Sequence, residues 1–101
     1  MRRTIDIKRG SIYVSAELYE TYFAGLDAVI ILIRDGNLLI LPVRQMAAGG
    51  CLLKMRNARG DRVATAPDVF EAHSLSDFSA MALEVTWSAD DGALVAPLLV
   101  N

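Results

Sequence analysis

The chain has 101 residues, a formal net charge of −2, and 53% of its residues are apolar. This composition excludes a disordered chain, which would be poor in apolar residues. It also excludes a disulfide framework, because Cys51 has no partner within the chain. The longest apolar runs, residues 28–33 and 38–43, are far shorter than the ~20 residues that span a bilayer. We therefore expect one soluble, cytoplasmic domain over residues 1–101, without a membrane partner, and the apolar excess favours a homo-oligomer.

The chain begins with two short alternating segments joined by a glycine turn. Residues 4–8 and 11–15 place isoleucine or valine at every second position, which predicts two half-buried strands. Gly10 lies between them, where a positive φ is needed for a tight turn. Ser15 is a suitable N-cap for a short helix over residues 16–23.

Two apolar runs follow, at residues 28–34 and 37–43, and they flank the dipeptide Asp35-Gly36. This arrangement is one of the strongest hairpin signals in a sequence. Nearly every position of the two runs is apolar, which is typical of strands that are buried on both faces. We therefore expect each side of this hairpin to be covered.

The second half repeats this order more loosely after a small, glycine-ended linker at residues 44–50. The helix is expected to begin near Pro67 and to continue to His73, since proline is favoured in a first helical turn. A polar connection leads from this helix to the last two strands. The strands of this half are expected over residues 51–57, 62–65, 83–88 and 93–100.

The two halves share an order of elements more than they share residues. Gly10 matches Gly60, fifty positions later, and the Asp35-Gly36 turn matches Asp91-Gly92, offset by fifty-six. We expect an internal duplication, although any small α+β domain contains hairpins and Asp-Gly turns. The expected fold class is α+β, mainly β, with two similar units fused into one swapped-hairpin-like barrel. Each unit is a β-hairpin, a short helix and a second β-hairpin, at about residues 3–43 and 54–100.

Residues 4–15, then Leu18 and the Asp35-Gly36 hairpin, resemble the swapped-hairpin family of AbrB, MraZ and MazE-type antitoxins. The shared pattern is a strand, a glycine turn with basic neighbours, a strand before a short helix, and a hairpin. The pattern recurs weakly in the second half, so the whole chain is similar to a fused pair, as in MraZ-like proteins. The resemblance implies two units with interleaved hairpins and a DNA-binding transcription regulator.

Two features depart from the family pattern. The proline expected near Ala16 is present only in the second unit, at Pro67. Acidic residues stand at both helix starts, where DNA-binding members have arginine: Glu17, Glu20, Asp68 and Glu71. This second departure argues against DNA binding.

Most of the basic residues lie in the first hairpin of each expected unit. They are Arg2, Arg3, Lys8, Arg9, Lys54, Arg56, Arg59 and Arg62. If a pseudo-two-fold axis relates the units, these cations share one surface that can hold a phosphate backbone. The alternative is that lysine and arginine prevent strand edges from pairing with other chains.

The acidic residues gather later in the sequence, where lysine and arginine are missing. From residue 68 onward they are Asp68, Glu71, Asp77, Glu84, Asp90 and Asp91. They form either a docking face for a basic protein partner or a solvated surface that aids solubility. Leftover apolar surface is the other candidate for a protein contact.

No constellation for catalysis is found. Cys51 and His73 are the single thiol and the single imidazole, and two ligands are too few for a zinc site. Gly49-Gly50 lacks the further glycine and the lysine of a phosphate-binding loop. We therefore predict no enzyme, no metal and no cofactor. The predicted function is a nucleic-acid-binding transcriptional regulator, and the alternative is a small protein-interaction or assembly factor on the same scaffold without DNA binding.

Overall fold

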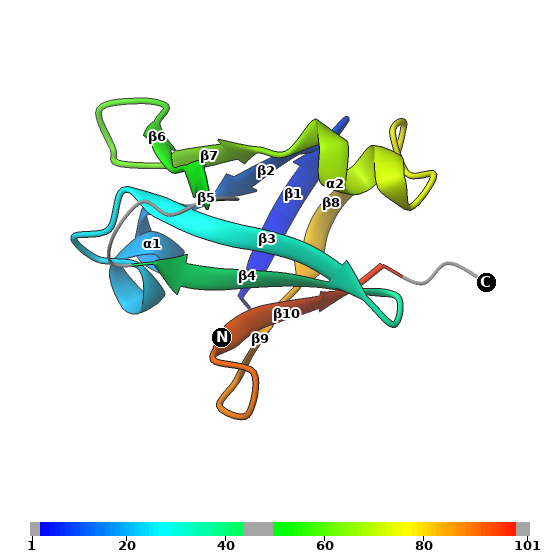
Figure 1. Cartoon of the computed structure of the whole chain (residues 1–101). Helices are drawn as coiled ribbons and strands as arrows, with labels where there is room; N and C mark the ends of the chain where they lie inside the picture. Colours follow the sequence, from blue (N-terminus) through cyan, green and yellow to red (C-terminus); the bar gives the residue numbers. More distant parts are fainter. Residues whose placement is uncertain (1–2, 44–49, 99–101) are drawn as a thin grey trace.

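The computed structural model describes residues 3–43 and 50–98, which form two five-stranded antiparallel sheets and two short helices (Figure 1). The strands of the first half are β1 (Thr4–Lys8), β2 (Ser11–Val14), β3 (Ala28–Arg34) and β4 (Asn37–Val43). Those of the second half are β5 (Gly50–Leu52), β6 (Lys54–Met55), β7 (Arg62–Thr65), β8 (Ser79–Glu84), β9 (Thr86–Ser88) and β10 (Ala93–Pro97). The helices are α1 (Ala16–Tyr22) and α2 (Pro67–Ala72). The strand order is β6-β7-β2-β1-β8 in sheet A and β5-β3-β4-β10-β9 in sheet B.

The first two hairpins form where the turn residues predict them. Arg9 and Gly10 have φ values of 48° and 84°, and Asp35 and Gly36 have φ values of 54° and 77°. Two successive positive φ values are typical of the type I′ turn, whose twist matches that of antiparallel strands. The predicted bounds of β1, β3 and β4 are confirmed for this reason.

The helices begin as the sequence predicts and end one residue earlier. The Ser15 side-chain oxygen accepts a hydrogen bond from the Leu18 N–H at 3.1 Å, which caps the start of α1. Pro67 is the first residue of α2, where its missing N–H leaves no donor unsatisfied. Phe23 and His73 are the C-caps, rather than the last helical residues.

Two of the predicted strands are broken, and this bears on the expected single barrel. The predicted strand 51–57 is divided at Leu53 into β5 and β6, and Val85 likewise separates β8 from β9. Both residues are buried, and at each of them the chain passes from one sheet to the other. The Leu53 N–H donates to the Asp27 carbonyl, and the Val85 N–H donates to the Arg3 carbonyl. Within the described residues a closed barrel is not seen.

In both sheets a hairpin of the first half lies between strands of the second half. β2 pairs with β7, and β4 pairs with β10. The first strand of each half also pairs with a later strand of the other half, β1 with β8 and β5 with β3. Neither half therefore forms a separate sheet, and the chain folds as one unit around one core.

The core lies between the inner faces of the two sheets. Ile5, Ile7, Ile12 and Val14 of sheet A belong to the same buried cluster as Val29, Ile31, Leu38, Ile40 and Leu94 of sheet B. The helices lie at opposite ends of this sandwich in Figure 1. Phe23, which follows α1, and Phe70 of α2 are both fully buried in the cluster. Each short helix thus supplies a large aromatic side chain to the space between the sheets.

Three further expectations concern the ends and the connections. The predicted linker lies outside the described residues except for Gly50, which begins β5, and the expected end of the last strand, at residues 99–100, also lies outside them. β8 begins at Ser79, four residues before the predicted start. Among the described helices, neither has the length and the apolar character needed to cross a membrane.

Candidate nucleic-acid interface

The outer face of sheet A is a polar surface whose side chains are exposed or half-buried. The strand register defines two rows across this face. The first row is Lys54, Val63, Tyr13 and Asp6. The second row is Thr65, Ser11, Lys8 and Ser79. Cations therefore stand on two different strands, and Tyr13 lies near the middle of the face.

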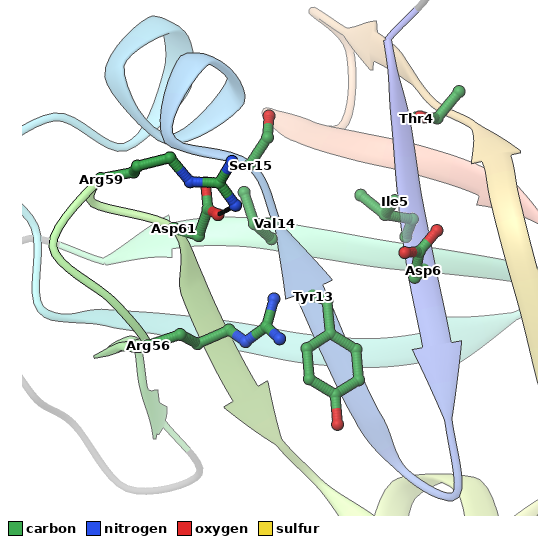
Figure 2. Close-up of a pocket in the computed structure, with 9 residues that line it drawn as sticks. All are labelled: Thr4, Ile5, Asp6, Tyr13, Val14, Ser15, Arg56, Arg59 and Asp61. Carbon is green, nitrogen blue, oxygen red and sulfur yellow. Dashed lines mark hydrogen bonds and ion pairs between the residues drawn. The ribbon is translucent and has the colours of Figure 1, made fainter.

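A shallow groove crosses this face beside Tyr13 (Figure 2). Its volume is about 280 Å³, and its polar lining includes Asp6, Arg56 and Arg59. The Arg56 guanidinium carbon lies 4.6 Å from the centre of the Tyr13 ring, in a cation–π contact. Figure 2 shows Arg56 extending toward Tyr13 from the segment after β6. A neighbouring groove continues to Lys8.

The predicted cations that the structure describes lie in the strands of sheet A or in segments next to them, but they do not form one cluster. Arg2 lies outside the described residues. Lys8 and Arg9 stand at the β1–β2 turn, whereas Arg59 stands in the loop between β6 and β7. Because β2 and β7 are antiparallel, these two turns lie at opposite ends of the sheet (Figure 1). The expected single surface is therefore a strip along the sheet, with cations at both ends.

Four of the predicted cations make contacts within the chain: Arg56 with Tyr13, as described above, and Arg3, Arg59 and Arg62. Arg3 donates a hydrogen bond to the Tyr22 hydroxyl at 2.7 Å. Arg62 lies over the Tyr19 ring at 4.0 Å and donates to the Gly60 carbonyl at 2.7 Å. These contacts stabilise the fold around α1, and sequence reasoning missed them, since the partners lie nineteen or more positions apart or in the backbone.

The Arg59 guanidinium forms an ion pair with Asp61, with 3.0 Å between Nη2 and Oδ2. Asp61 also accepts hydrogen bonds from the Asn57 side-chain amide at 3.0 Å and from the Ala16 backbone N–H at 2.8 Å. The hydrogen bonds from Asn57 and Ala16, together with the charge of Arg59, lower the pKa of Asp61 below its usual value. Asp61 lies in a loop of the second half, and its carboxylate thus binds the backbone at the start of α1 in the first half. Nothing in the local sequence indicates this role.

The remaining cations are free for a ligand. Lys8, Arg9 and Lys54 are exposed, and within the described residues their side chains form no hydrogen bond or ion pair. Two acids lie on the same face. Asp6 accepts a hydrogen bond from the Ala82 N–H at 2.8 Å, and Glu84 stands in the row next to it. The face is therefore mixed in charge, with the free cations at its rim.

The predicted acidic face is not formed. Asp68 and Glu71 lie on α2, whereas Asp90 and Asp91 lie in the β9–β10 turn at the opposite end of the molecule (Figure 1). Asp91 forms an ion pair with Arg34, at 3.0 Å. The acidic run of the sequence is therefore divided among separate surfaces, since Glu84 lies on sheet A.

The single thiol and the single imidazole occupy structural positions. Cys51 packs half-buried against the core, and this burial raises the pKa of its thiol. His73 ends α2, where its Nδ1 lies 3.2 Å from the Val69 carbonyl. In residues 3–43 and 50–98, no group of three or more histidine, cysteine, aspartate or glutamate side chains lies close enough together to hold a metal ion.

Comparisons of the chain with protein-family models, with curated proteins and with solved structures found no match.

Proposed function

We propose that the chain is a non-enzymatic, nucleic-acid-binding regulator that contacts phosphates through the outer face of sheet A. The observation that carries this proposal is the set of exposed cations on this face, Lys8, Arg9 and Lys54, which have no partner within the described residues. Phosphate oxygens supply the missing acceptors, and such contacts need no enclosed pocket.

The spacing of the cations suits a nucleic-acid backbone. Lys54 is aligned with Asp6, which lies three strands away across the sheet, and Lys8 lies two residues beyond Asp6 along β1. With strands ~4.8 Å apart and ~3.3 Å per residue, the backbones of Lys54 and Lys8 are about 16 Å apart. Duplex DNA carries one phosphate charge per ~1.7 Å of its axis, so a span of this length meets more than one phosphate. The face would therefore follow a backbone rather than read base edges, so we expect weak dependence on sequence.

The register of the β2–β7 ladder supports a chain built from two related units. In this ladder Tyr13 lies opposite Val63, fifty positions later. Gly10 and Gly60 are related by the same offset, and both have a positive φ. When equivalent residues face each other in an antiparallel ladder, a two-fold axis passes between them.

The register of the β4–β10 ladder gives the same result with the second offset. Leu39 lies opposite Val95, fifty-six positions later, and this offset also relates Gly36 to Gly92. We infer one pseudo-two-fold axis through both sheets, and a duplicated unit with interleaved hairpins, as the resemblance to AbrB and MraZ proteins implies. The outer face of sheet A then lies across this axis.

Titration of a labelled duplex of about 20 base pairs, followed by fluorescence anisotropy, tests the proposal. Affinity falls with about the 0.9 power of the salt concentration for each phosphate contact. Relative to ~1 M salt, each contact therefore contributes about 15-fold to affinity at 50 mM salt. The variant Lys8→Gln/Lys54→Gln should therefore bind about 200-fold more weakly.

The control is Ala24→Glu/Arg34→Gln, which lowers the net charge by the same two units at exposed positions outside sheet A. It should leave affinity within about threefold, because charges beyond a Debye length are screened. Equal weakening by both variants, or no binding by the wild-type chain at 50 mM salt, would overturn the proposal.

A second candidate function is a small protein-interaction or assembly factor that does not bind DNA. The outer face of sheet B favours it, because apolar side chains fill the central strands of that face. An apolar contact keeps its affinity at high salt, whereas phosphate binding weakens steeply. The salt dependence of any partner's binding therefore separates the two candidates.

A further inference from the structure

The strand register shows which residues of sheet B point away from the core. Val29, Ile31, Ile33, Leu38, Ile40, Leu94 and Ala96 are members of the buried cluster between the sheets. Since successive side chains of a strand point to opposite faces, their neighbours point outward. The apolar outer face of sheet B is Ala28, Ile30, Leu32, Leu39, Leu41, Val43, Ala93, Val95 and Pro97.

This face is continuous and almost uncharged. Leu39 lies at its centre, between Leu32 and Val95 on the neighbouring strands. Leu39 is 4% exposed although it is not part of the core cluster. The charged residue at the rim is Arg34, whose guanidinium is engaged by Asp91 at 3.0 Å.

No described element packs on this face. In Figure 1, β3, β4 and β10 lie in front of β1 and β8, so the view is onto the outer side of sheet B. The apolar pattern of β3 and β4 requires cover on both sides. Sheet A covers the inner side, and within residues 3–43 and 50–98 no element covers the outer side.

We propose that a second copy of this chain covers the outer face of sheet B, so that the two sheets pack face to face in a symmetric dimer. β3 and β4 have seven residues each, β10 has five, and the edge strands β5 and β9 have three each. With ~4.8 Å between strands and ~3.3 Å per residue, the face measures about 400 Å². Two such faces bury roughly 800 Å², which is the size of a weak or transient interface. Monomers rarely leave an apolar patch of several hundred Å² uncovered.

A second copy fits this face better than a protein of different chemistry. A symmetric dimer uses the same patch on both copies, so the patch must complement itself. An apolar face without a free charge meets this condition, because no like charges are brought together. The ladder that places Leu39 opposite Val95 lies across the middle of the face, so the face is nearly the same after a half-turn. In this dimer the two copies of sheet A point outward on opposite sides.

Sedimentation velocity of the full chain over a range of concentrations tests the dimer. We expect a species of twice the 11.0 kDa chain mass at about 10 μM, and we expect it to persist in 1 M salt, because the contact carries no charge. The variant Leu32→Thr/Leu41→Thr places two hydroxyl groups on the face and should be monomeric. Threonine is favoured in strands, so the sheet is retained.

The matched control is Met81→Thr, an apolar-to-polar change at a residue on β8 that is 80% exposed, and it should remain dimeric. Circular dichroism and a cooperative melt verify the fold of each variant. If the double variant does not fold, Val95→Thr, which keeps the side-chain shape, should still raise the dimer dissociation constant about tenfold. A wild-type monomer at about 100 μM, or a dimer that survives these face variants, overturns the proposal. This result is independent of duplex binding, which concerns the opposite sheet.

Discussion

Replacement of Gly10 by alanine should destabilise the fold far more than the same change at Gly92. Gly10 has a φ of 84°, and a Cβ at this position would lie 2.9 Å from the Pro67 Cα. The Gly10 carbonyl also accepts a hydrogen bond from the Ala66 N–H at 2.8 Å. The β1–β2 turn of one half is therefore packed directly on the start of α2 in the other half.

Three contributions give the size of the effect. The positive φ costs alanine about 1–2 kcal/mol relative to glycine. Overpacking against the Pro67 backbone costs about 1–3 kcal/mol, and displacement of the Ala66 hydrogen bond costs about 1 kcal/mol. Gly10→Ala should therefore lower the free energy of unfolding by about 4 kcal/mol. Gly92 has a φ of 62° and no atom within 4 Å of an added Cβ, so Gly92→Ala should cost about 1–2 kcal/mol.

Thermal unfolding followed by far-ultraviolet circular dichroism measures the difference, at one chain concentration for all variants. A loss of 1 kcal/mol lowers the Tm of a domain of this size by about 4–8 °C. We expect a decrease of about 20 °C for Gly10→Ala and of less than about 10 °C for Gly92→Ala. Equal decreases would refute the contact between the β1–β2 turn and α2, since backbone strain alone would then explain both variants.

Three further predictions concern single side chains. The pKa of Asp61 is lowered in the folded chain, so its stabilisation is present above the unfolded pKa of about 3.9 and is lost as the pH falls through the folded value. Urea unfolding should therefore show Asp61→Asn less stable than wild type at pH 7, with the difference shrinking as the pH falls below the unfolded pKa, and a constant difference would contradict this. Asp6→Asn removes a negative charge from the groove of sheet A and should tighten duplex binding at low salt, whereas unchanged affinity would place the nucleic acid elsewhere. The raised pKa of Cys51 should make its thiol react more slowly with a disulfide reagent at pH 8 in the folded chain than in urea, and equal rates would show that β5 is open.

The turns and the strands of the first half follow from local sequence. Gly10 and the Asp35-Gly36 pair adopt the backbone that these residues favour, and they determine the ends of β1, β3 and β4. A type I′ turn needs no distant contact to specify it. The order of elements in the second half was also predictable, because its turns contain glycine at matching positions.

The bends at Leu53 and Val85 could not be predicted, because they depend on which sheet each neighbouring strand joins. Periodicity indicates that a residue is buried, but not that the chain changes sheets beside it. The apolar runs of β3 and β4 have the same limitation. Their sequence indicates that both faces of the β3–β4 hairpin are covered. In the described residues, sheet A covers the inner face.

The candidate site was predictable in its residue types and not in its contacts. The sequence places cations in two segments, but the contact of Arg62 with Tyr19 becomes visible only when β7 and α1 are brought together. Trp87 is a further example. It is 40% exposed on the short edge strand β9, where it stacks on Tyr22 with ring centres 5.2 Å apart, a contact that the local sequence does not indicate.

The salt dependence of duplex binding tests the central claim most directly. With three phosphate contacts, from Lys8, Arg9 and Lys54, the logarithm of the affinity should fall with a slope of about −2.7 against the logarithm of the salt concentration. Between 50 and 200 mM salt this slope corresponds to about 40-fold weaker binding. A slope near zero, or no measurable binding at 50 mM salt, would contradict a phosphate-binding role for sheet A.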